Sequence, residues 1–372
     1  MEKGITKISV SGFKSIAKET ALDIKPLTLL TGANSSGKSS FIQPLLLLKQ
    51  TLEAPYKPES LLLNGANVKF TSFDQMLTFQ KDKPKKKWLD VVVESDTSGW
   101  SFTYPTIGSD KSEIKRSKND FVATFRVVVV EEDILWIIKK IIHVPGLRGN
   151  PERIYQVAGV APTFPGTFEN YTASVISHWE EKKSDKLQQL CSHLALLGLT
   201  SQVSANRLND AQIEIKVGRL PKNGRSKKDM VNIADVGFGV SQTLPVLVAL
   251  LVAEPGQLVY LEQPEIHLHP CAQRILAEIL VDAANRGVKV VAETHSSLLL
   301  LAVQTLIAKK IIDKDDVALH WFERDKLGMT NVTTADIDEA GCFGDWPVDF
   351  GDVELEAEGN FIEAVALTRK ER

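Results

Sequence analysis

One segment constrains this chain more than any other: Gly32-Ala33-Asn34-Ser35-Ser36-Gly37-Lys38-Ser39. The segment fits the phosphate-loop pattern G-x-x-x-x-G-K-[ST] at every position. A short apolar run at residues 27–30 precedes it, and a helical pattern over residues 39–52 follows it. A buried strand, a glycine-rich loop and a helix in this order are the context that the pattern requires. The sequence therefore predicts a phosphate-binding site at the start of a helix.

The residues of this loop are expected to hold a nucleotide and its metal ion. The glycines let backbone N–H groups curl around the phosphates, at the positive end of the helix dipole. The Lys38 ammonium would reach the β- and γ-phosphates, and the Ser39 hydroxyl would bind Mg²⁺. The residues expected to line the nucleotide are Gly32, Asn34, Ser35, Ser36, Gly37, Lys38, Ser39 and Ser40. The alternative, a Gly- and Ser-rich turn before an ordinary helix, is disfavoured by the flanking strand.

A second apolar run, residues 258–261, ends in Glu262-Gln263-Pro264-Glu265. A carboxylate at the end of a strand beside a phosphate loop is where Mg²⁺ is held, so Glu262 is the expected metal ligand. The residue that follows is usually a glutamate that orients the attacking water, and here it is Gln263. An amide positions water by hydrogen bonds but is no strong base, so Glu265 is a candidate substitute. The alternative is a solvated acidic turn.

A zinc site is an alternative for the segment that follows, because two histidines lie near a glutamate in Glu265-Ile266-His267-Leu268-His269-Pro270. No third ligand has metal-like spacing, however, and Pro270 is well placed to begin a helix. We therefore interpret the segment as a loop at a subunit contact.

Two further features lie beside predicted helix starts. Residues 235–242 contain Gly237, Gly239 and Ser241 before an apolar helix, which makes a second anion-binding helix end; an ordinary N-cap is the alternative. His295 follows the apolar strand at residues 288–291, where it could contact the γ-phosphate or the attacking water. A structural histidine is the alternative there.

The coarse pattern predicts an α/β fold. After residue 233, helices at 240–253, 271–285 and 297–308 alternate with strands at 257–261, 288–292 and 316–322, which indicates a parallel sheet. Strand-like runs at 89–93, 100–104, 121–130 and 134–144 predict an antiparallel subdomain, and residues 171–197 predict a small helical insert. We expect an N-terminal lobe (1–145), a lid or helical insert (146–230), a C-terminal lobe (231–340) and a tail (341–372).

These motifs together resemble ABC-type P-loop ATPases of the SMC, RecF and OLD (overcoming lysogenisation defect) group. Residues 11–15 (Ser-Gly-Phe-Lys-Ser) are similar to the opening of that group, residues 262–270 to its E-x-P-E-x-H-L-H-P block, and residues 294–296 to its Thr-His-Ser. The resemblance implies ATP and Mg²⁺ as cofactors, with Lys14 near the nucleotide and His295 as γ-phosphate sensor. It also implies a homodimer through the ATP sites, in which residues 237–242 of one subunit close on the nucleotide of the other.

The chain is more similar still to stand-alone OLD-like ATPases, in residues 146–155, 237–245 and 345–347. That resemblance implies a bacterial protein that controls a separate effector, a nuclease or toxin, in antiphage defence. A Toprim nuclease domain is not expected within this chain, and residues 349–358 are interpreted as a solvated or partner-binding tail. Because Gln263 departs from the family glutamate, a nucleotide-gated scaffold with little hydrolysis is an open alternative.

Composition limits the partners and the location. The net charge is −3, so a uniformly basic nucleic-acid binder is excluded, although nucleic acid remains a candidate partner through local patches. Basic loops at residues 81–87 and 222–228, with Arg148 and Arg153 as further phosphate-contact candidates, keep a RecF-like DNA-repair ATPase open. The favoured alternative for the two loops is a solvated hairpin tip that protects a sheet edge, because no aromatic residues are interleaved with the lysines. The three cysteines form no CxxC pair and no apolar run could span a bilayer, so we expect a cytoplasmic protein without a membrane partner.

Overall fold

The fold is built on a six-stranded sheet that is parallel except at one edge. The computed structural model describes residues 4–55, 61–79, 88–95, 98–105, 126–127, 132–219, 229–344 and 359–362. The sheet has the order β15-β14-β3-β13-β12-β7, and only the β14–β15 pair is antiparallel. Its strands are β3 (Leu27–Gly32), β7 (Ile142–Val144), β12 (Leu258–Glu262), β13 (Lys289–Glu293), β14 (Val317–Arg324) and β15 (Thr330–Thr334). The predicted α/β fold with a parallel sheet is confirmed.

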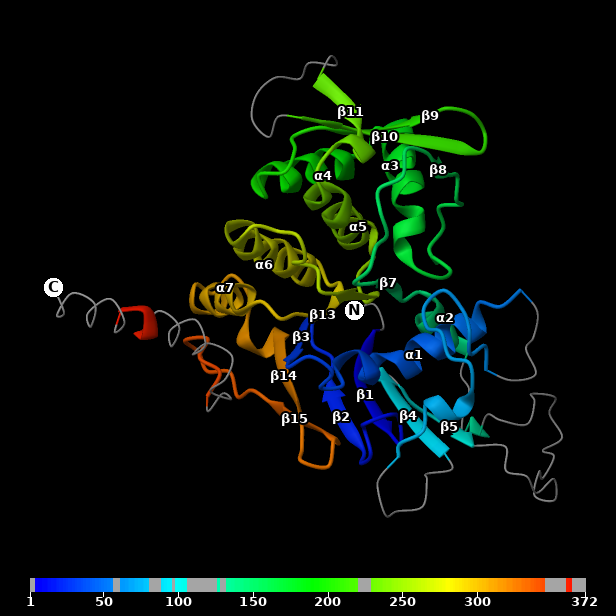
Figure 1. The fold of residues 1–372 in the computed structure, drawn as a ribbon, viewed down its shortest axis with the longest axis vertical. Helices are drawn as coiled ribbons and strands as arrows, with labels where there is room; N and C mark the ends of the chain where they lie inside the picture. Colours follow the sequence, from blue (N-terminus) through cyan, green and yellow to red (C-terminus); the bar gives the residue numbers. More distant parts are fainter. Residues whose placement is uncertain are drawn as a thin grey trace.

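Helices cover both faces of this sheet, because successive residues of a strand point to opposite sides. On one side Val259 and Leu261 of β12 pack in a core that includes α5, α6 and α7, and on the other side Leu258 and Tyr260 pack in a core with α1. Figure 1 shows α5, α6 and α7 above the sheet and α1 below it. The helices are α1 (Lys38–Leu52), α5 (Phe238–Val252), α6 (Pro270–Asn285) and α7 (Ser297–Ala308).

An antiparallel sheet lies against the α1 side, as the sequence predicted. Its order is β2-β1-β4-β5-β6. The strands are β1 (Ile5–Ser11), β2 (Thr20–Asp23), β4 (Trp88–Ser95), β5 (Ser98–Pro105) and β6 (Arg126–Val127). The buried side chains of β1 and β4 share one core with α1.

The predicted strand over residues 134–144 is wrong in its first half. Residues Glu132–Lys139 form helix α2, and only Ile142–Val144 is a strand, β7. The apolar spacing explains the error, because Ile134 and Ile138 are buried one helical turn apart while Trp136 between them is half exposed. A dense apolar run does not distinguish helix from strand by periodicity alone.

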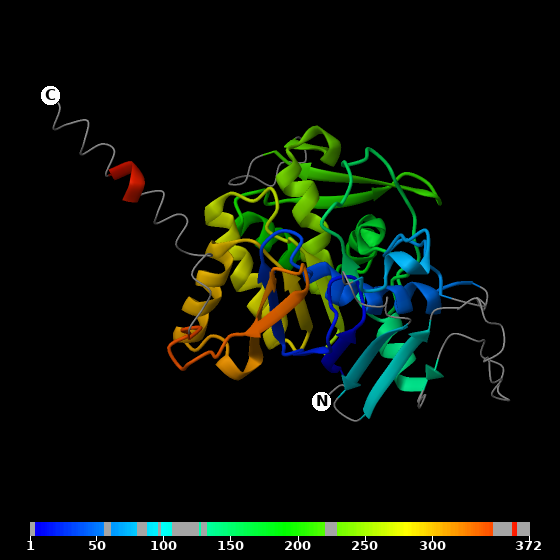
Figure 2. The ribbon, with the colours of Figure 1, turned by 60° about the horizontal axis from the view of Figure 1, so that its bottom comes forward.

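The predicted helical insert is present, but it also carries a sheet that the sequence reading missed. Helices α3 (Thr172–Glu181) and α4 (Asp185–Leu196) occupy the expected range. Beside them, β10 (Gln212–Gly218) pairs with β8 (Tyr155–Gln156), β9 (Val203–Arg207) and β11 (Met230–Asn232). Figure 2 shows this green sheet at the opposite end of the molecule from the cyan strands β4 and β5.

Candidate functional site

The phosphate loop and two acidic strand ends lie at one edge of the central sheet. The parallel strands β3, β13 and β12 are neighbours, and the carboxyl ends of parallel strands meet at the same edge. Glu262 is the last residue of β12 and Glu293 is the last residue of β13, and the two are directly paired in register. Both are two residues beyond a side chain buried in the α1 core, so both project toward the start of α1, where Ser39 lies.

The phosphate loop has the backbone shape that its glycines allow. Gly32 has φ +135°, and a Cβ there would lie 2.1 Å from the Phe322 carbonyl oxygen. Gly37 has φ +113°, and a Cβ there would lie 2.4 Å from Thr330 Oγ1. Gly37 is also the N-cap of α1 and brings no side-chain cap, so the first N–H groups of the helix are left for a ligand. Asn34 and Ser35 form the exposed tip of the loop.

Lys38 is folded back across this loop. Its Nζ donates hydrogen bonds to the carbonyl oxygens of Gly32 at 3.0 Å and Ala33 at 2.9 Å. Burial lowers the pKa of Lys38, and the charge of Glu293 opposes that shift. The buried Ser36 hydroxyl has no hydrogen-bond partner among the described residues. A buried ammonium and an unpaired hydroxyl inside a loop of backbone donors fit a bound phosphate group.

Glu262 is held as a carboxylate by groups from the neighbouring strand β7 and the loop that follows it. Its Oε1 lies 3.1 Å from Nε2 of His143, and its Oε2 accepts a 3.0 Å hydrogen bond from the Gly146 N–H. Burial acts to raise the pKa of Glu262, but the hydrogen bonds from His143 and Gly146 outweigh it, and the pKa is lowered. An ionised strand-end carboxylate beside a phosphate loop fits a Mg²⁺ ligand.

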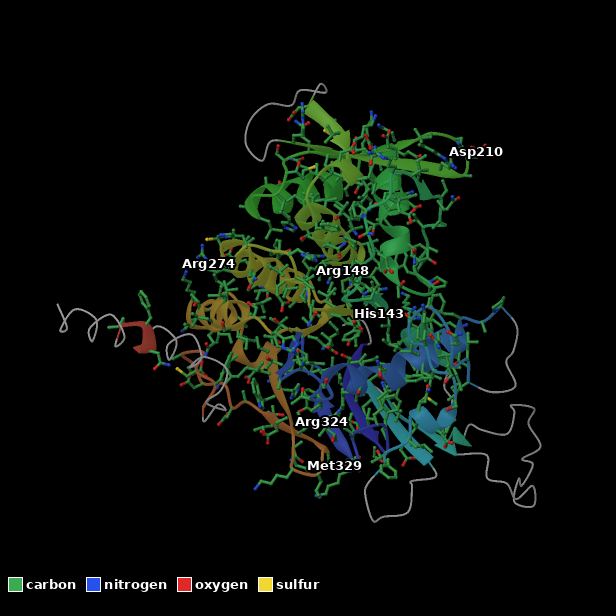
Figure 3. The ribbon with its side chains drawn as sticks, in the orientation of Figure 1. His143, Arg148, Asp210, Arg274, Arg324 and Met329 are labelled. Carbon is green, nitrogen blue, oxygen red and sulfur yellow. The ribbon has the colours of Figure 1, made fainter. Side chains whose placement is uncertain are left out.

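Arg148 does not point at a phosphate, contrary to the sequence-based suggestion. Its guanidinium donates to the carbonyl oxygens of Glu262 at 2.7 Å, Gln263 at 3.1 Å and Gln242 at 3.2 Å. The residue is 7% exposed, and burial lowers its pKa to about 10, so it stays charged. Figure 3 labels Arg148 and His143 close together at the centre of the molecule. Arg148 therefore ties the end of β12 to the first turns of α5.

Replacing Arg148 with methionine is expected to lower the free energy of unfolding by about 2–4 kcal/mol, because three carbonyl groups lose a charged donor, although the Ile266 N–H still donates to Gln263. Denaturant unfolding monitored by circular dichroism measures this. Arg153→Met is the matched control, because Arg153 lies in the same loop but forms an exposed ion pair with Asp235, and little change is expected. Equal stability of the two variants would contradict the anchoring role.

Glu293 is a site residue that the sequence reading missed. Its Oε2 accepts a 2.8 Å hydrogen bond from the Ser39 hydroxyl, and its Oε1 accepts one from the Tyr260 hydroxyl. The side chain is 4% exposed. Burial, reinforced by the charge of Glu262, raises the pKa of Glu293 to about 7, although the hydrogen bonds from Tyr260 and Ser39 act in the opposite direction. The available signal was its position at the end of a predicted buried strand, directly before Thr294 and His295.

The other predicted catalytic residues lie around the same edge. Glu265 Oε1 accepts hydrogen bonds from Thr294 Oγ1 at 2.8 Å and the His295 N–H at 2.9 Å. Burial raises the pKa of Glu265, and its Oε2 has no partner among the described residues. Burial also lowers the pKa of His295, and so does the charge of Lys38, while a hydrogen bond with the Gly32 backbone acts in the opposite direction. Gln263 has φ +43°, and its N–H donates to the Glu293 carbonyl at 2.9 Å.

The glycine turn forms the start of α5. Gly237 is the N-cap with no side-chain cap, and the space beside its Cα is open for 4 Å. A Cβ at Gly239 would lie 3.1 Å from Leu199 Cδ2 and 3.6 Å from the His267 carbonyl oxygen, in the loop before α6. The Ser241 hydroxyl is used within the helix, where it donates to the Phe238 carbonyl at 3.1 Å. The open donors of the turn are therefore backbone N–H groups.

Lys14 lies near the phosphate helix but contacts protein groups. Its Nζ donates to Gln43 Oε1 of α1 at 2.6 Å and lies 4.9 Å from the centre of the Phe70 ring. Burial lowers the pKa of Lys14. The next residue, Ser15, is tied to the loop through Thr330, whose Oγ1 lies 2.7 Å from both Ser15 Oγ and the Ser36 carbonyl oxygen.

The two histidines that suggested zinc have protein partners. His269 caps α6 by accepting from the Cys271 N–H, and the His267 ring lies 5.9 Å from the Phe238 ring. Across the described ranges, no group of three or more His, Cys, Asp or Glu residues is arranged to hold a metal ion by itself. A Mg²⁺ ion that shares its shell with phosphates and water does not need such a group.

Several sequence-based predictions concern residues outside the described ranges: the basic loops 81–87 and 222–228, residues 345–347 and the tail 349–358. Within the residues that are described, no helix is long and apolar enough to cross a bilayer.

Two family models match the chain, one after the other. Residues 4–141 match the "AAA ATPase domain" family, and residues 137–302 match the family described as "AAA domain, putative AbiEii toxin, Type IV TA system". One curated relative is the Old nuclease of Escherichia phage P2, which is 21% identical over 80% of this chain. The match spans 57% of that protein's length.

Solved structures of SMC heads share the fold. An SMC head bound to the C-winged helix domain of ScpA superposes with a TM-score of 0.59 at 13% identity, covering 91% of this chain and 99% of that chain. A Pyrococcus furiosus SMC head with an extended coiled coil gives a TM-score of 0.52 at 12% identity, covering 98% of this chain and 100% of that chain.

Proposed function

We propose that this chain, which matches AAA-family ATPase domains over residues 4–141 and 137–302 and is similar to the Old nuclease, is an ATPase of the SMC- and OLD-like group that binds ATP·Mg²⁺ at this sheet edge and hydrolyses it slowly. One observation supports the proposal: the phosphate loop, with Lys38 folded across it and Ser39 at its end, lies at the same sheet edge as the Glu262 carboxyl group, two strands away. These groups fit a triphosphate and a hard divalent cation.

Each residue has a role in that reaction. Lys38 would turn from the loop carbonyls to the β- and γ-phosphates, where its charge offsets theirs. Ser39 and Glu262 would hold Mg²⁺, which stabilises charge on the phosphate oxygens when it is bound. Gln263 or Glu265 would position the attacking water, and His295, beside Lys38, would sense the γ-phosphate. Residue 263 is an amide rather than a carboxylate base, so we expect slow ATP turnover.

The ATP-bound form is proposed to be a homodimer that regulates a separate effector. The open turn at Gly237, with Phe238 half exposed beside it, supports contact with the second subunit's nucleotide through backbone N–H groups. The match to the AAA domain family of putative type IV toxin–antitoxin toxins and the similarity to a phage nuclease support a role in bacterial antiphage defence. The effector would then be a nuclease or a toxin.

Gln263 also favours a second function, a nucleotide-gated scaffold with little hydrolysis. The two differ in steady-state phosphate release by the purified protein, measured beside ATP binding by calorimetry. Mg²⁺-dependent release is the expected result. ATP binding without release would favour the scaffold, and absence of both would overturn the proposed function.

A further inference from the structure

We propose that Glu293 is a second carboxylate of the Mg²⁺ site, which holds the Ser39 hydroxyl in the orientation that binds the ion. The inference rests on the proposed function and extends it to a residue on a third strand end. Glu293 lies between the phosphate strand β3 and the acidic strand β12, because β13 is the neighbour of both.

The hydrogen bond between Ser39 and Glu293 gives the chemical reason. A hydroxyl that coordinates a cation uses an oxygen lone pair, so its single proton has to point to an acceptor elsewhere. Glu293 Oε2 is that acceptor, at 2.8 Å. A charged acceptor also increases the electron density on the hydroxyl oxygen, as partners behind metal ligands commonly do.

A hydrogen-bonded network fixes Glu293 and Glu262 on either side of one aromatic pair. Tyr260 is fully buried and donates to Oε1 of Glu293. Its ring stacks on the His143 ring at 5.3 Å, and His143 Nε2 lies 3.1 Å from Glu262. The two carboxylates are therefore oriented by neighbouring side chains rather than by solvent, which is the usual design of a built metal site.

The negative charge of Glu293 and Glu262 also favours a bound cation. Glu293 is almost completely buried, and it is paired in register with a second acid, Glu262. Two carboxylates at one site repel each other, and a buried one is costly without a positive partner. Lys38 donates to loop carbonyls instead of to Glu293. A hard divalent cation bound by oxygen ligands would relieve both costs.

The test is the Mg²⁺ dependence of ATP binding, measured by calorimetry with Glu293→Gln. Glutamine keeps the size and an acceptor oxygen but removes the charge. The Mg²⁺ concentration for half-maximal enhancement of ATP affinity is expected to rise about tenfold or more, as for other residues behind metal ligands. ATP binding in excess EDTA should stay within about twofold of wild type, because this carboxylate acts on the metal rather than on the phosphates. Glu180→Gln in α3, which also removes a hydrogen-bonded carboxylate, is the control with wild-type behaviour.

A double-mutant cycle tests the route through Ser39. If Glu293 acts by orienting that hydroxyl, Glu293→Gln should have little further effect in a Ser39→Ala background. Tyr260→Phe, which keeps the fold and frees one carboxylate oxygen, should give a smaller shift in the same direction. Wild-type Mg²⁺ dependence in Glu293→Gln, or full additivity with Ser39→Ala, would overturn this inference alone. Wild-type protein that binds no ATP at any Mg²⁺ concentration would overturn the proposed function and this inference together.

Discussion

Replacing Lys38 with alanine is expected to weaken ATP binding at least tenfold and to remove measurable turnover. The Lys38 Nζ lies inside the phosphate loop, bonded to the Gly32 and Ala33 carbonyls, whereas Arg324 donates to the Ser35 carbonyl at the exposed tip of the loop. Without this charge, a triphosphate in that loop would lose a cation that offsets its own charge, while the nearby carboxylates of Glu262 and Glu293 would still repel it. At about 4 Å, one lost charge pair in a partly buried site is worth several kcal/mol. Calorimetry with ATP and a phosphate-release assay measure the two effects.

Lys140→Ala is the control for this change. Lys140 also forms a polar contact, an ion pair with Glu254 at 3.1 Å, but it lies before β7, away from the carboxyl edge of the sheet. Its removal should leave ATP affinity and turnover at wild-type values. Unchanged ATP affinity in Lys38→Ala would show that the loop does not hold the nucleotide.

Replacing Gln263 with glutamate is expected to raise ATP turnover by roughly tenfold to a hundredfold, because a positioned general base typically contributes 10²–10⁴. The main chain at Gln263 is fixed by the Glu293 carbonyl on one side and by Arg148 on the other, so the new carboxylate should take the position of the amide. Steady-state phosphate release at saturating ATP measures the change.

Gln263→Ala is the companion variant. If the amide positions water in the wild-type protein, its removal should lower turnover further, whereas a site that uses Glu265 instead would be indifferent to residue 263. Wild-type turnover in both variants would exclude Gln263 from the chemistry.

The sequence predicted the phosphate loop, the acidic strand and the alternating helices because each is a local pattern. Residues 32–39 specify their own loop, since Gly32 and Gly37 supply the positive φ angles. The regular alternation after residue 233 specifies a parallel sheet, since such strands need helical crossovers. The error at residues 134–139 also comes from a local pattern. A dense apolar run fits the two-residue period of a strand as well as the 3.6-residue period of a helix.

What the sequence could not predict depends on which strands become neighbours. Glu293 gains its importance from the position of β13 between β3 and β12, and strand order is a tertiary property. Arg148 was grouped with phosphate contacts because arginine in a glycine-rich loop commonly binds anions, yet it is buried against backbone carbonyls. The sheet around β10 was missed because its partners β8 and β11 are only two and three residues long.

The most direct test of the account is the mass of the protein in solution with and without ATP. Light scattering after size exclusion should give about the 41.1 kDa of one chain without nucleotide, and about twice that mass with ATP·Mg²⁺. Gly237→Glu, which places a negative charge at the open turn of α5, should prevent the doubling while each subunit still binds ATP at its own phosphate loop. A single-chain mass at saturating ATP·Mg²⁺, in protein shown by calorimetry to have bound it, would contradict the ATP-dependent dimer.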